Sequence, residues 1–483
     1  MNIKKLTVFL LSLLASVLEI KAQNATDALR FSFLLPYGTA RYNAMGGAFG
    51  ALGNDIAGIH DNPAGVGVFR MDETIFSFGF LYSSIDANFQ GITTPATQDR
   101  LLLGNLGIVR RVEDKKQAKH KASFALTFNR LANLDSEHFI EGVHPGSIGA
   151  VWFDRVQGLT EDQLFSQDPY IYYMAFFPFL IDYSDENTKV IDKLWGFGDQ
   201  ILHSHLRQTR GNISELGLTY GGNYLNRVQW GVQLGIPFIN YSEQITYTES
   251  NFDPASILRF YQFRELLSLN GTGVNLKAGV IYRPEQNVRL SASVHTPSLN
   301  YIRGSFEVAP ESRTFDNQIH RPNPLVDDNI RFQLTTPMRI QLGGAYIFDN
   351  LGLISAEYHL TDFSTNRLRS SLYNLSVDNQ QIRDIYRISH QFRVGTEWRI
   401  ERMALRTGFN HITSPFKNDA ISGRFNGLHL GLGYRGQEFH ADVSYSYFIN
   451  HPEFFMYDAD YITPAKLRNV RNTLMLTLIF RSI

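Results

Sequence analysis

The feature that most constrains this chain is a period-two alternation of apolar and polar residues, which recurs in about fourteen segments beyond residue 74. Residues 439–447 read Phe-His-Ala-Asp-Val-Ser-Tyr-Ser-Tyr, so Phe, Ala, Val and Tyr share one face while His, Asp and Ser share the other. Residues 386–400 follow the same rule. Successive side chains of a β-strand point to opposite sides, and a strand between lipid and a wet interior shows this pattern. The alternation predicts a sheet with one apolar and one polar face.

The lengths of the connections between these segments alternate as well. Short connections such as Leu225-Asn226-Arg227 and Glu401-Arg402 follow even-numbered strands. Those after odd-numbered strands run from roughly ten to eighty residues. An even strand count with short turns at one end and long loops at the other is the arrangement of outer-membrane barrels, whose closure removes unpaired edges. We expect strands near residues 74–82, 102–110, 121–129, 212–224, 228–248, 271–283, 288–308, 329–348, 351–363, 386–400, 403–414, 425–435, 439–451 and 471–481.

The predicted fold class is therefore all-β, a transmembrane antiparallel β-barrel of about 14 strands over residues 74–483 with long extracellular loops. The aromatic content of 13% suits lipid-facing surfaces and interfacial girdles. The last predicted strand carries Phe480 near its end, which resembles the signal that barrel-assembly machinery recognises, although Arg481-Ser482-Ile483 follow it.

The first 22 residues read as a secretory signal peptide. Lys4 and Lys5 precede an apolar run over residues 6–18, and the small residue Ala22 precedes Gln23. The run is too short to span about 30 Å of hydrocarbon. The net charge of −1 gives no electrostatic argument for nucleic acid, and the absence of cysteine removes disulfides, thiolate metal sites and cysteine nucleophiles.

Residues 27–73 do not alternate and are rich in turn-forming residues. They contain Ala40-Arg41, Met45-Gly46-Gly47-Ala48, Asp55 and Asn62-Pro63-Ala64. Gly, Asn and Pro favour a compact, turn-rich element. A plug folded back into the barrel lumen and a loose periplasmic tail both fit this composition.

These residues resemble the hatch signature of the FadL/TodX family of outer-membrane transporters for hydrophobic molecules. Residues 271–284, 295–297 and 335–339 are similar to the barrel of that family, particularly in its Bacteroidetes-type members. The resemblance implies a fourteen-stranded barrel, a hatch over residues 23–73, and a multi-pass location in the bacterial outer membrane. It also implies passive transport of hydrophobic compounds, such as long-chain fatty acids, through the hatch-plugged barrel. The matching hatch residues are Gly46, Gly47, Asp55, Asn62, Pro63 and Ala64.

Two apolar stretches are candidate ligand contacts, because sites for small molecules are concave and mostly apolar. One stretch lies near the N terminus, and the other lies over residues 170–180 in the longest predicted loop. Packing within the hatch or against the barrel rim explains the same residues as well. The candidates are Phe31, Phe33, Leu34, Leu35, Phe176, Phe177 and Phe179.

The residues show no convergent set of catalytic groups. His203 and His205 could ligate a metal from one strand face, but they stand in the longest predicted loop without a partner at metal-site spacing. Four further polar residues fall on predicted lumen faces, where lining of the wall accounts for them. These are Glu357, His359, His440 and Asp442. We therefore expect no catalytic residue, no metal and no cofactor, and an outer-membrane enzyme is only a third alternative.

The second alternative is a protein-binding barrel of the PorV-like type, which serves type IX secretion. Long aromatic loops suit protein contacts as well as small hydrophobic ligands. The expected partners are hydrophobic small molecules, outer-membrane lipid and lipopolysaccharide, and the barrel-assembly machinery. Exported proteins are the partners under the alternative, and no nucleic acid is expected.

Overall fold

The computed structural model describes residues 25–112, 120–183, 191–195, 200–418 and 423–482, so the predicted signal peptide over residues 1–22 lies outside the described part. None of the helices in the described part is long and apolar enough to cross a membrane. The helices are α2 (Ala25–Arg30), α3 (Ala40–Ala44), α4 (Ile56–Asp61), η1 (Pro63–Val68), α5 (Gly149–Val156), α6 (Glu161–Gln167), α7 (Pro169–Ile171), η2 (Tyr172–Phe176), η3 (Phe363–Thr365) and α8 (Ser376–Ile385).

Fourteen antiparallel strands form a closed barrel, which confirms the predicted fold class. Closure follows from the pairing of β1 with β2 on one side and with β22 on the other. In wall order the strands are β1 (Asp72–Phe89), β2 (Ile92–Val112), β3 (His120–Asn133) with β4 (Ser136–Pro145), β7 (Gln200–Tyr224), β8 (Val228–Ser250), β9 (Leu258–Tyr282), β10 (Val288–His295) with β11 (Leu299–Thr314), β14 (Arg339–Phe348) with β13 (Leu325–Thr335), β15 (Gly352–Asp362), β17 (Ile388–Ile400), β18 (Met403–Ile412), β19 (Phe425–Arg435), β20 (Phe439–Asn450) and β22 (Ala465–Ser482). The remaining short strands are β5 (Ile181–Tyr183), β6 (Ile191–Lys193), β12 (Ile319–His320), β16 (Arg367–Arg369) and β21 (Glu453–Phe454).

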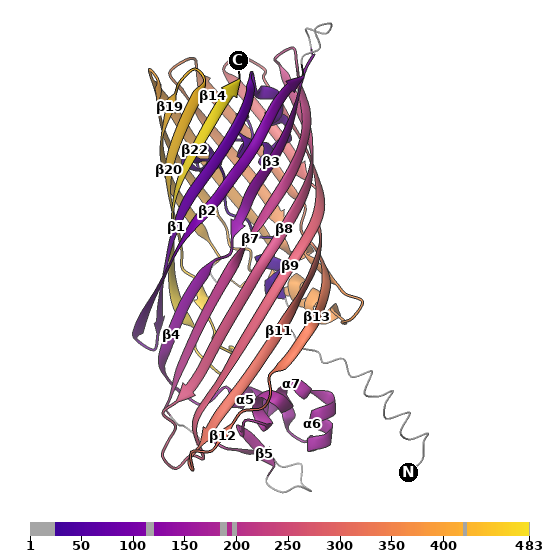
Figure 1. Ribbon diagram of the computed structural model, residues 1–483, viewed down its shortest axis with the longest axis vertical. Coiled ribbons are helices and arrows are strands. Elements are labelled where there is room, and N and C mark those ends of the chain that lie inside the picture. The colour runs from indigo at the N-terminus through magenta and orange to yellow at the C-terminus, as the bar shows by residue number, and fades with distance from the viewer. Residues whose placement is uncertain (1–24, 113–119, 184–190, 196–199, 419–422, 483) are drawn as a thin grey trace, which may run out of the picture.

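The two ends of the barrel differ as the connection lengths predict. Short turns gather at one end, the turn end, which also holds the C terminus and is uppermost in Figure 1. The opposite loop end carries α5, α6, α7 and β5, which together with η2 and β6 we call the helical lobe. The lobe belongs to the large apolar cluster that fills the loop-end half of the molecule.

The side-chain faces of the strands match the predicted alternation. In β17 the outward Phe392, Val394 and Trp398 are 48%, 47% and 41% exposed, whereas the inward Arg393 and Glu397 are 5% and 0% exposed. A belt of exposed apolar residues thus surrounds the turn-end half of the barrel, as a lipid-facing wall requires.

The belt does not extend to the loop end of the long strands. Along β8 the outward residues change from Leu234 and Phe238 to Asn240, Ser242 and Gln244. The loop-end portions of β7, β8 and β9 therefore extend beyond the predicted membrane.

The longest predicted loop proved to be largely structured, which corrects that prediction. Its ends form β4 and the first half of β7, and its centre forms the helical lobe. His203 and His205 consequently lie in β7 and not in a loop. Two predicted strands, over residues 288–308 and 329–348, are each interrupted at a Thr-Pro pair, because proline has no N–H for the ladder.

The N-terminal segment, which we define as residues 25–71, is mostly buried and contacts the inward face of the wall. Its helices α3 and α4 and the 3₁₀ helix η1 are short and are joined by turns. The backbone N–H of Ala40 donates to the Thr477 hydroxyl of β22 at 2.7 Å. The side chain of Arg339 from β14 donates to the carbonyl of Ser32 at 2.6 Å. These bonds exclude the alternative of a loose tail for residues 25–71.

Candidate functional site

The side chain of Asn62 ties the N-terminal segment to itself and to the wall. Its amide nitrogen donates to the carbonyl of Gly50 at 2.8 Å and to that of Val280 in β9 at 3.3 Å. Its amide oxygen accepts the N–H of Ala64 at 3.0 Å and so caps η1. Gly279 makes room, because a Cβ there would lie 1.9 Å from the Asn62 oxygen. Asn62 thus links Gly50 and Ala64 of the segment to Val280 of the wall.

Three other signature residues shape the turns of the segment. Gly46 and Gly47 have φ of +62° and +79°, a left-handed conformation that residues with a Cβ rarely adopt. Asp55 caps the N terminus of α4, where it accepts the N–H of Ala57 at 2.9 Å. Asp55 also accepts the hydroxyl of Thr39, the cap of α3, at 2.6 Å, so one carboxylate joins the two helix starts.

Pro63 and Ala64 begin η1. Pro63 stands in the first turn, where its missing N–H would have no helical partner in any case. Ala64 is fully buried, and Val66 two residues later joins Ile75 of β1 and Val109 of β2 in an apolar cluster. The six residues of the predicted signature thus lie in one compact element against the wall.

Buried ion pairs connect the N-terminal segment with the wall. The guanidinium of Arg41 lies 2.9 Å from the carboxylate of Glu397, and that of Arg393 lies 2.6 Å from Asp61. Glu397 also pairs with Arg406 of β18 at 2.8 Å. Because an unpaired buried charge is costly, the Arg41–Glu397 and Arg393–Asp61 pairs penalise displacement of the segment unless water replaces them.

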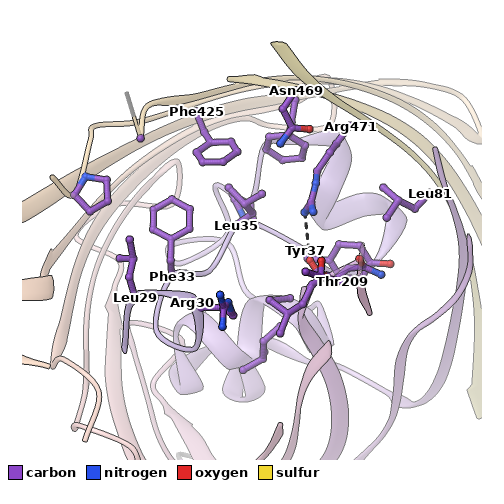
Figure 2. A pocket seen from close by; sticks show the side chains of 18 of the residues that line it. Leu29, Arg30, Phe33, Leu35, Tyr37, Leu81, Thr209, Phe425, Asn469 and Arg471 are labelled. Carbon is purple, nitrogen blue, oxygen red and sulfur yellow. Dashed lines mark hydrogen bonds between the residues drawn. The ribbon is translucent and has the colours of Figure 1, made fainter. Parts of the chain in front are cut away.

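A cavity of about 350 Å³ lies between the N-terminal segment and the wall, on the loop-end side of the segment (Figure 2). The segment supplies Leu29, Phe33, Leu35 and Tyr37, whose side chains point toward the wall residues across the cavity. Its lining is mainly apolar. The wall residues that line it are Leu81, Leu131, Ala132, Asn133, Leu134, Arg207, Thr209, Tyr241, Pro415, Phe416, Gly423, Phe425, Phe448, Asn469, Arg471 and Thr473.

Two of the three cationic groups around the cavity are neutralised by carboxylates. Arg30 forms a short ion pair with Asp27 and lies 3.6 Å from Glu243. Arg207 also donates to Glu243, at 2.7 Å. Burial lowers the pKa of Arg30, but the carboxylates of Asp27 and Glu243 and the ring of Tyr241 outweigh burial and raise it overall.

The third cation, Arg471, has a different environment. Its guanidinium donates to the carbonyls of Asn133 at 3.2 Å and Asp135 at 2.9 Å. Among the described residues no carboxylate oxygen lies within 4.0 Å of it, and its Nε has no hydrogen-bond partner. A guanidinium is always charged, so the cavity offers one cationic group that makes no direct ion pair, although the Asp135 carboxylate acts on it from a longer distance.

The structure brings the N-terminal ligand candidates to this region. Phe33 and Leu35 line the cavity. Phe31 is buried and packs edge-on against Tyr241, with ring centroids 5.7 Å apart. Leu34 lines two smaller cavities of about 50 and 40 Å³ nearby.

The loop candidates lie elsewhere. Phe176 is at the end of η2 and packs within the helical lobe, stacked on Tyr172 at 5.0 Å between ring centroids. Phe177 and Phe179 are 46% and 37% exposed. None of these three lines the cavity beside the N-terminal segment, so the two candidate sets do not form one site.

Residues 131–134, which line the cavity next to a register shift at the end of β3 that we call the bend, were not predicted to contact a ligand, and neither was Arg471. Arg471 has the inward parity of Thr473 and Thr477, so the alternation of the last strand would have placed its charge on the lumen face. The bend lies where β3 ends and β4 begins, and it could not be recognised because β4 was assigned to a loop.

The histidines considered for metal binding have other partners. His203 contacts the Tyr247 hydroxyl at 2.7 Å, and His205 stacks on His138 with ring centroids 5.6 Å apart. All three are buried.

A group of Asp61, Glu357 and His359 brings three possible ligand atoms within 4.8 Å of one another. Asp61 in this group is already paired with Arg393, and Glu357 accepts the N–H of Phe49 at 3.1 Å. These carboxylates therefore serve the contact between the segment and the wall.

Comparison with known proteins gave matches at the level of structure only. No protein-family model matches the chain, and no curated protein matches it. The fold is similar to that of a FadL homologue of Pseudomonas aeruginosa, at 13% identity and a TM-score of 0.58, over 93% of this chain and 99% of that one. It is also similar to the Pseudomonas putida toluene transporter TodX (10% identity, TM-score 0.54) and to the CymD monoaromatic hydrocarbon channel (11%, 0.52), each over 93% of this chain and 99% of the other.

The barrel and its N-terminal segment thus define a class of fold, a closed fourteen-stranded membrane barrel with further structure inside. Within that class the chain has the fold of the FadL/TodX-type barrels. At sequence identities this low, the structural similarity establishes the fold only. It confirms that the fold expected from the sequence resemblance is correct.

Proposed function

We propose that this chain is a channel of the bacterial outer membrane that carries hydrophobic molecules by passive diffusion. In this proposal the N-terminal segment is the hatch, and the cavity beside it is a binding site on the transport route. The structures that share the fold are described as a FadL homologue, a toluene transporter and a monoaromatic hydrocarbon channel, which supports the proposal.

One observation carries the proposal: a mainly apolar cavity of about 350 Å³, bounded on one side by the hatch and on the other by the wall. This volume is within the range of about 300–1,000 Å³ typical of small-molecule sites. A ligand there would contact Phe33 and Leu35, so its binding and the position of the hatch would affect each other.

The environment of Arg471 favours an amphipathic substrate with a carboxylate, such as a long-chain fatty acid. A bound carboxylate would supply the direct ion pair that Arg471 lacks among the described residues and would accept a bond from its free Nε–H. An aromatic hydrocarbon would use only the apolar lining. The binding of a fatty acid should therefore depend on the Arg471 guanidinium, whereas the binding of a hydrocarbon should not.

Binding of a fluorescent long-chain fatty acid to the purified protein tests the proposal. Phe33→Ser together with Leu35→Ser should weaken binding at least ~10-fold, because two apolar side chains lose contact with the ligand. Arg471→Gln should weaken fatty-acid binding and leave toluene uptake unchanged. Phe165→Ser, at a residue of the helical lobe that is 61% exposed and outside the cavity, is the matched control. Equal binding by all variants would contradict the site.

A second candidate function, a protein-binding barrel of the PorV-like type, is favoured by exposed apolar residues at the loop end. Phe165, Phe315 and Ile319 are 61%, 63% and 61% exposed there. Normal uptake combined with loss of surface-protein export in a strain that lacks the chain would support this function over transport. Contacts with the barrel-assembly machinery remain a prediction from the last strand.

A further inference from the structure

A second, larger concavity lies on the outer face of the barrel, away from the hatch. It holds about 730 Å³ and spans β9, β11, β13, the end of β16 and the segment after β16. Its outward position follows from strand parity. In β11 Tyr301 is 65% exposed while its neighbours Asn300 and Ile302 are each 2% exposed and face inward. We call this concavity the outer groove.

Three arginines share the outer groove. Arg303 of β11 and Arg331 of β13 are directly paired across the two strands, and Arg369 of β16 is paired with Gln333, two residues along the same face. All three side chains are exposed. Directly opposed side chains on one sheet face have Cβ atoms about 5 Å apart, so like charges there are destabilising.

No carboxylate offsets these charges within the part of the chain that the structure describes. None of the three arginines has a carboxylate oxygen within 4.0 Å, and no residue that lines the outer groove is acidic. The acidic side chains of Glu307 and Asp328 line a separate groove closer to the loop end. A trio of guanidinium groups on one face is therefore suited to an anion from outside the chain.

The position of the outer groove along the barrel indicates where that anion resides. Toward the turn end, the same face continues into the lipid-facing residues Val274, Leu276 and Leu299, which are 43%, 57% and 39% exposed. Tyr301 stands between this belt and the arginines, as interfacial aromatic residues do. The arginines thus lie at the level of the headgroups in the outer leaflet, with acyl chains directly below them.

We propose that the outer groove binds the phosphorylated headgroup of a lipopolysaccharide-type glycolipid. Arg303, Arg331 and Arg369 pair with its phosphates, because guanidinium forks bond phosphate oxygens bidentately. The acyl chains lie along the apolar belt next to Tyr301. The site rests on the proposed outer-membrane location, but it is separate from the transport route, since the outer groove and the hatch cavity share no lining residue.

Native mass spectrometry of the full-length, delipidated protein tests this site with two probes, bisphosphorylated lipid A and the same lipid without phosphates. The wild type should bind the phosphorylated form at least ~10-fold more tightly, since each arginine near an anionic headgroup contributes about 1 kcal/mol. The triple variant Arg303→Gln, Arg331→Gln, Arg369→Gln should lose this preference. Its folded fraction is checked by the gel shift between heated and unheated samples.

A matched triple variant at the turn end, Arg70→Gln, Arg227→Gln, Arg402→Gln, removes the same charge far from the outer leaflet and should keep the preference. Equal binding of the two lipids by the wild type, or a preserved preference in the outer-groove variant, would overturn the proposal. Displacement of lipid A by an equimolar amount of inorganic phosphate would also overturn it, in favour of a free-anion site. This lipid-binding test does not depend on the uptake of hydrophobic molecules, so failure of the transport proposal would leave its outcome unaffected.

Discussion

At the scale of single residues, Asn62 provides the most direct test of how the hatch is held. Asn62→Ala removes two donated bonds, to Gly50 and Val280, and one accepted bond, from Ala64. We expect the free energy of unfolding to fall by about 1–3 kcal/mol, because three hydrogen bonds are lost from a buried site. Thermal unfolding in detergent measures the change. Asn62→Asp keeps the acceptor but places a buried carboxylate oxygen against the carbonyls of Gly50 and Val280, so it should cost at least as much as Asn62→Ala. Equal stability of all three proteins would contradict an anchoring role.

Lipid-facing residues should tolerate charge according to their depth. Val443 is outward and 37% exposed within the apolar belt, whereas Ser268 is outward and exposed beyond it. Val443→Arg should cost roughly 2–4 kcal/mol and Ser268→Arg roughly 0–1 kcal/mol, because only the first buries a cation in hydrocarbon. Equilibrium unfolding in lipid vesicles gives both values, and equal costs would show that the belt is misplaced.

The direction of each side chain could be predicted from sequence, but its surroundings could not. The period-two alternation of apolar and polar residues predicts that Ser444 faces inward, and the residue is 2% exposed. The wet interior assumed for such positions is filled there, because Ala44 of the hatch lies next to the wall at Gly431. Likewise, the hydrogen bonds of Asn62 require the space at Gly279. That glycine is far from Asn62 in sequence, and nothing in the residues around it indicates the contact.

At the scale of elements, the helical lobe is attached to the barrel through a buried carboxyl group. Glu249 of β8 accepts the Ser147 hydroxyl at 2.5 Å and the N–H of Ile148 at 2.6 Å, immediately before α5. Tyr247 donates to the same carboxyl at 2.7 Å. Burial raises the pKa of Glu249 from 4.5 to about 7, and the three donors offset only part of this increase. Nearby His203, 3.6 Å away, has its pKa lowered by burial to about 4 and so remains neutral.

Attachment of the lobe should therefore weaken as the pH rises. A released Glu249 titrates near 4.5 and the attached one near 7, so the attached state binds more protons between these values and is destabilised as the pH rises through this window. Hydrogen exchange in α5, corrected for the intrinsic effect of pH, should be faster at pH 8 than at pH 5. Glu249→Gln should remove the difference, and a pH-independent ratio in the wild type would contradict the mechanism.

The strands inside the membrane were predictable because lipid forces their outward residues to be apolar. Predicted strands over residues 425–435 and 403–414 differ from β19 and β18 by two residues at most. Beyond the belt this constraint disappears. The first half of β7 has inward His203 and His205 and a mixed outward face, so its alternation carries little contrast in hydropathy.

At the scale of the whole molecule, the wall and the hatch depend on different forces. The wall is closed by strand pairing around the full circumference, and its apolar belt faces outward. The hatch is held by ion pairs and hydrogen bonds to inward side chains such as Glu397 and Arg393. If water entered the lumen, it could solvate those charges, so the wall does not require the hatch for its own stability.

Deletion of residues 27–62 should consequently leave a folded barrel that leaks. Backbone pairing in the wall survives, so the variant should still shift in mobility when boiled in detergent. Without the hatch the lumen fills with water, and conductance in planar bilayers should rise well above that of the full chain. Binding of long-chain fatty acid should be lost with Phe33 and Leu35, which the deletion removes from the cavity. A barrel that folds yet stays closed to ions would show that the loop-end lobe, and not the hatch, seals the pore.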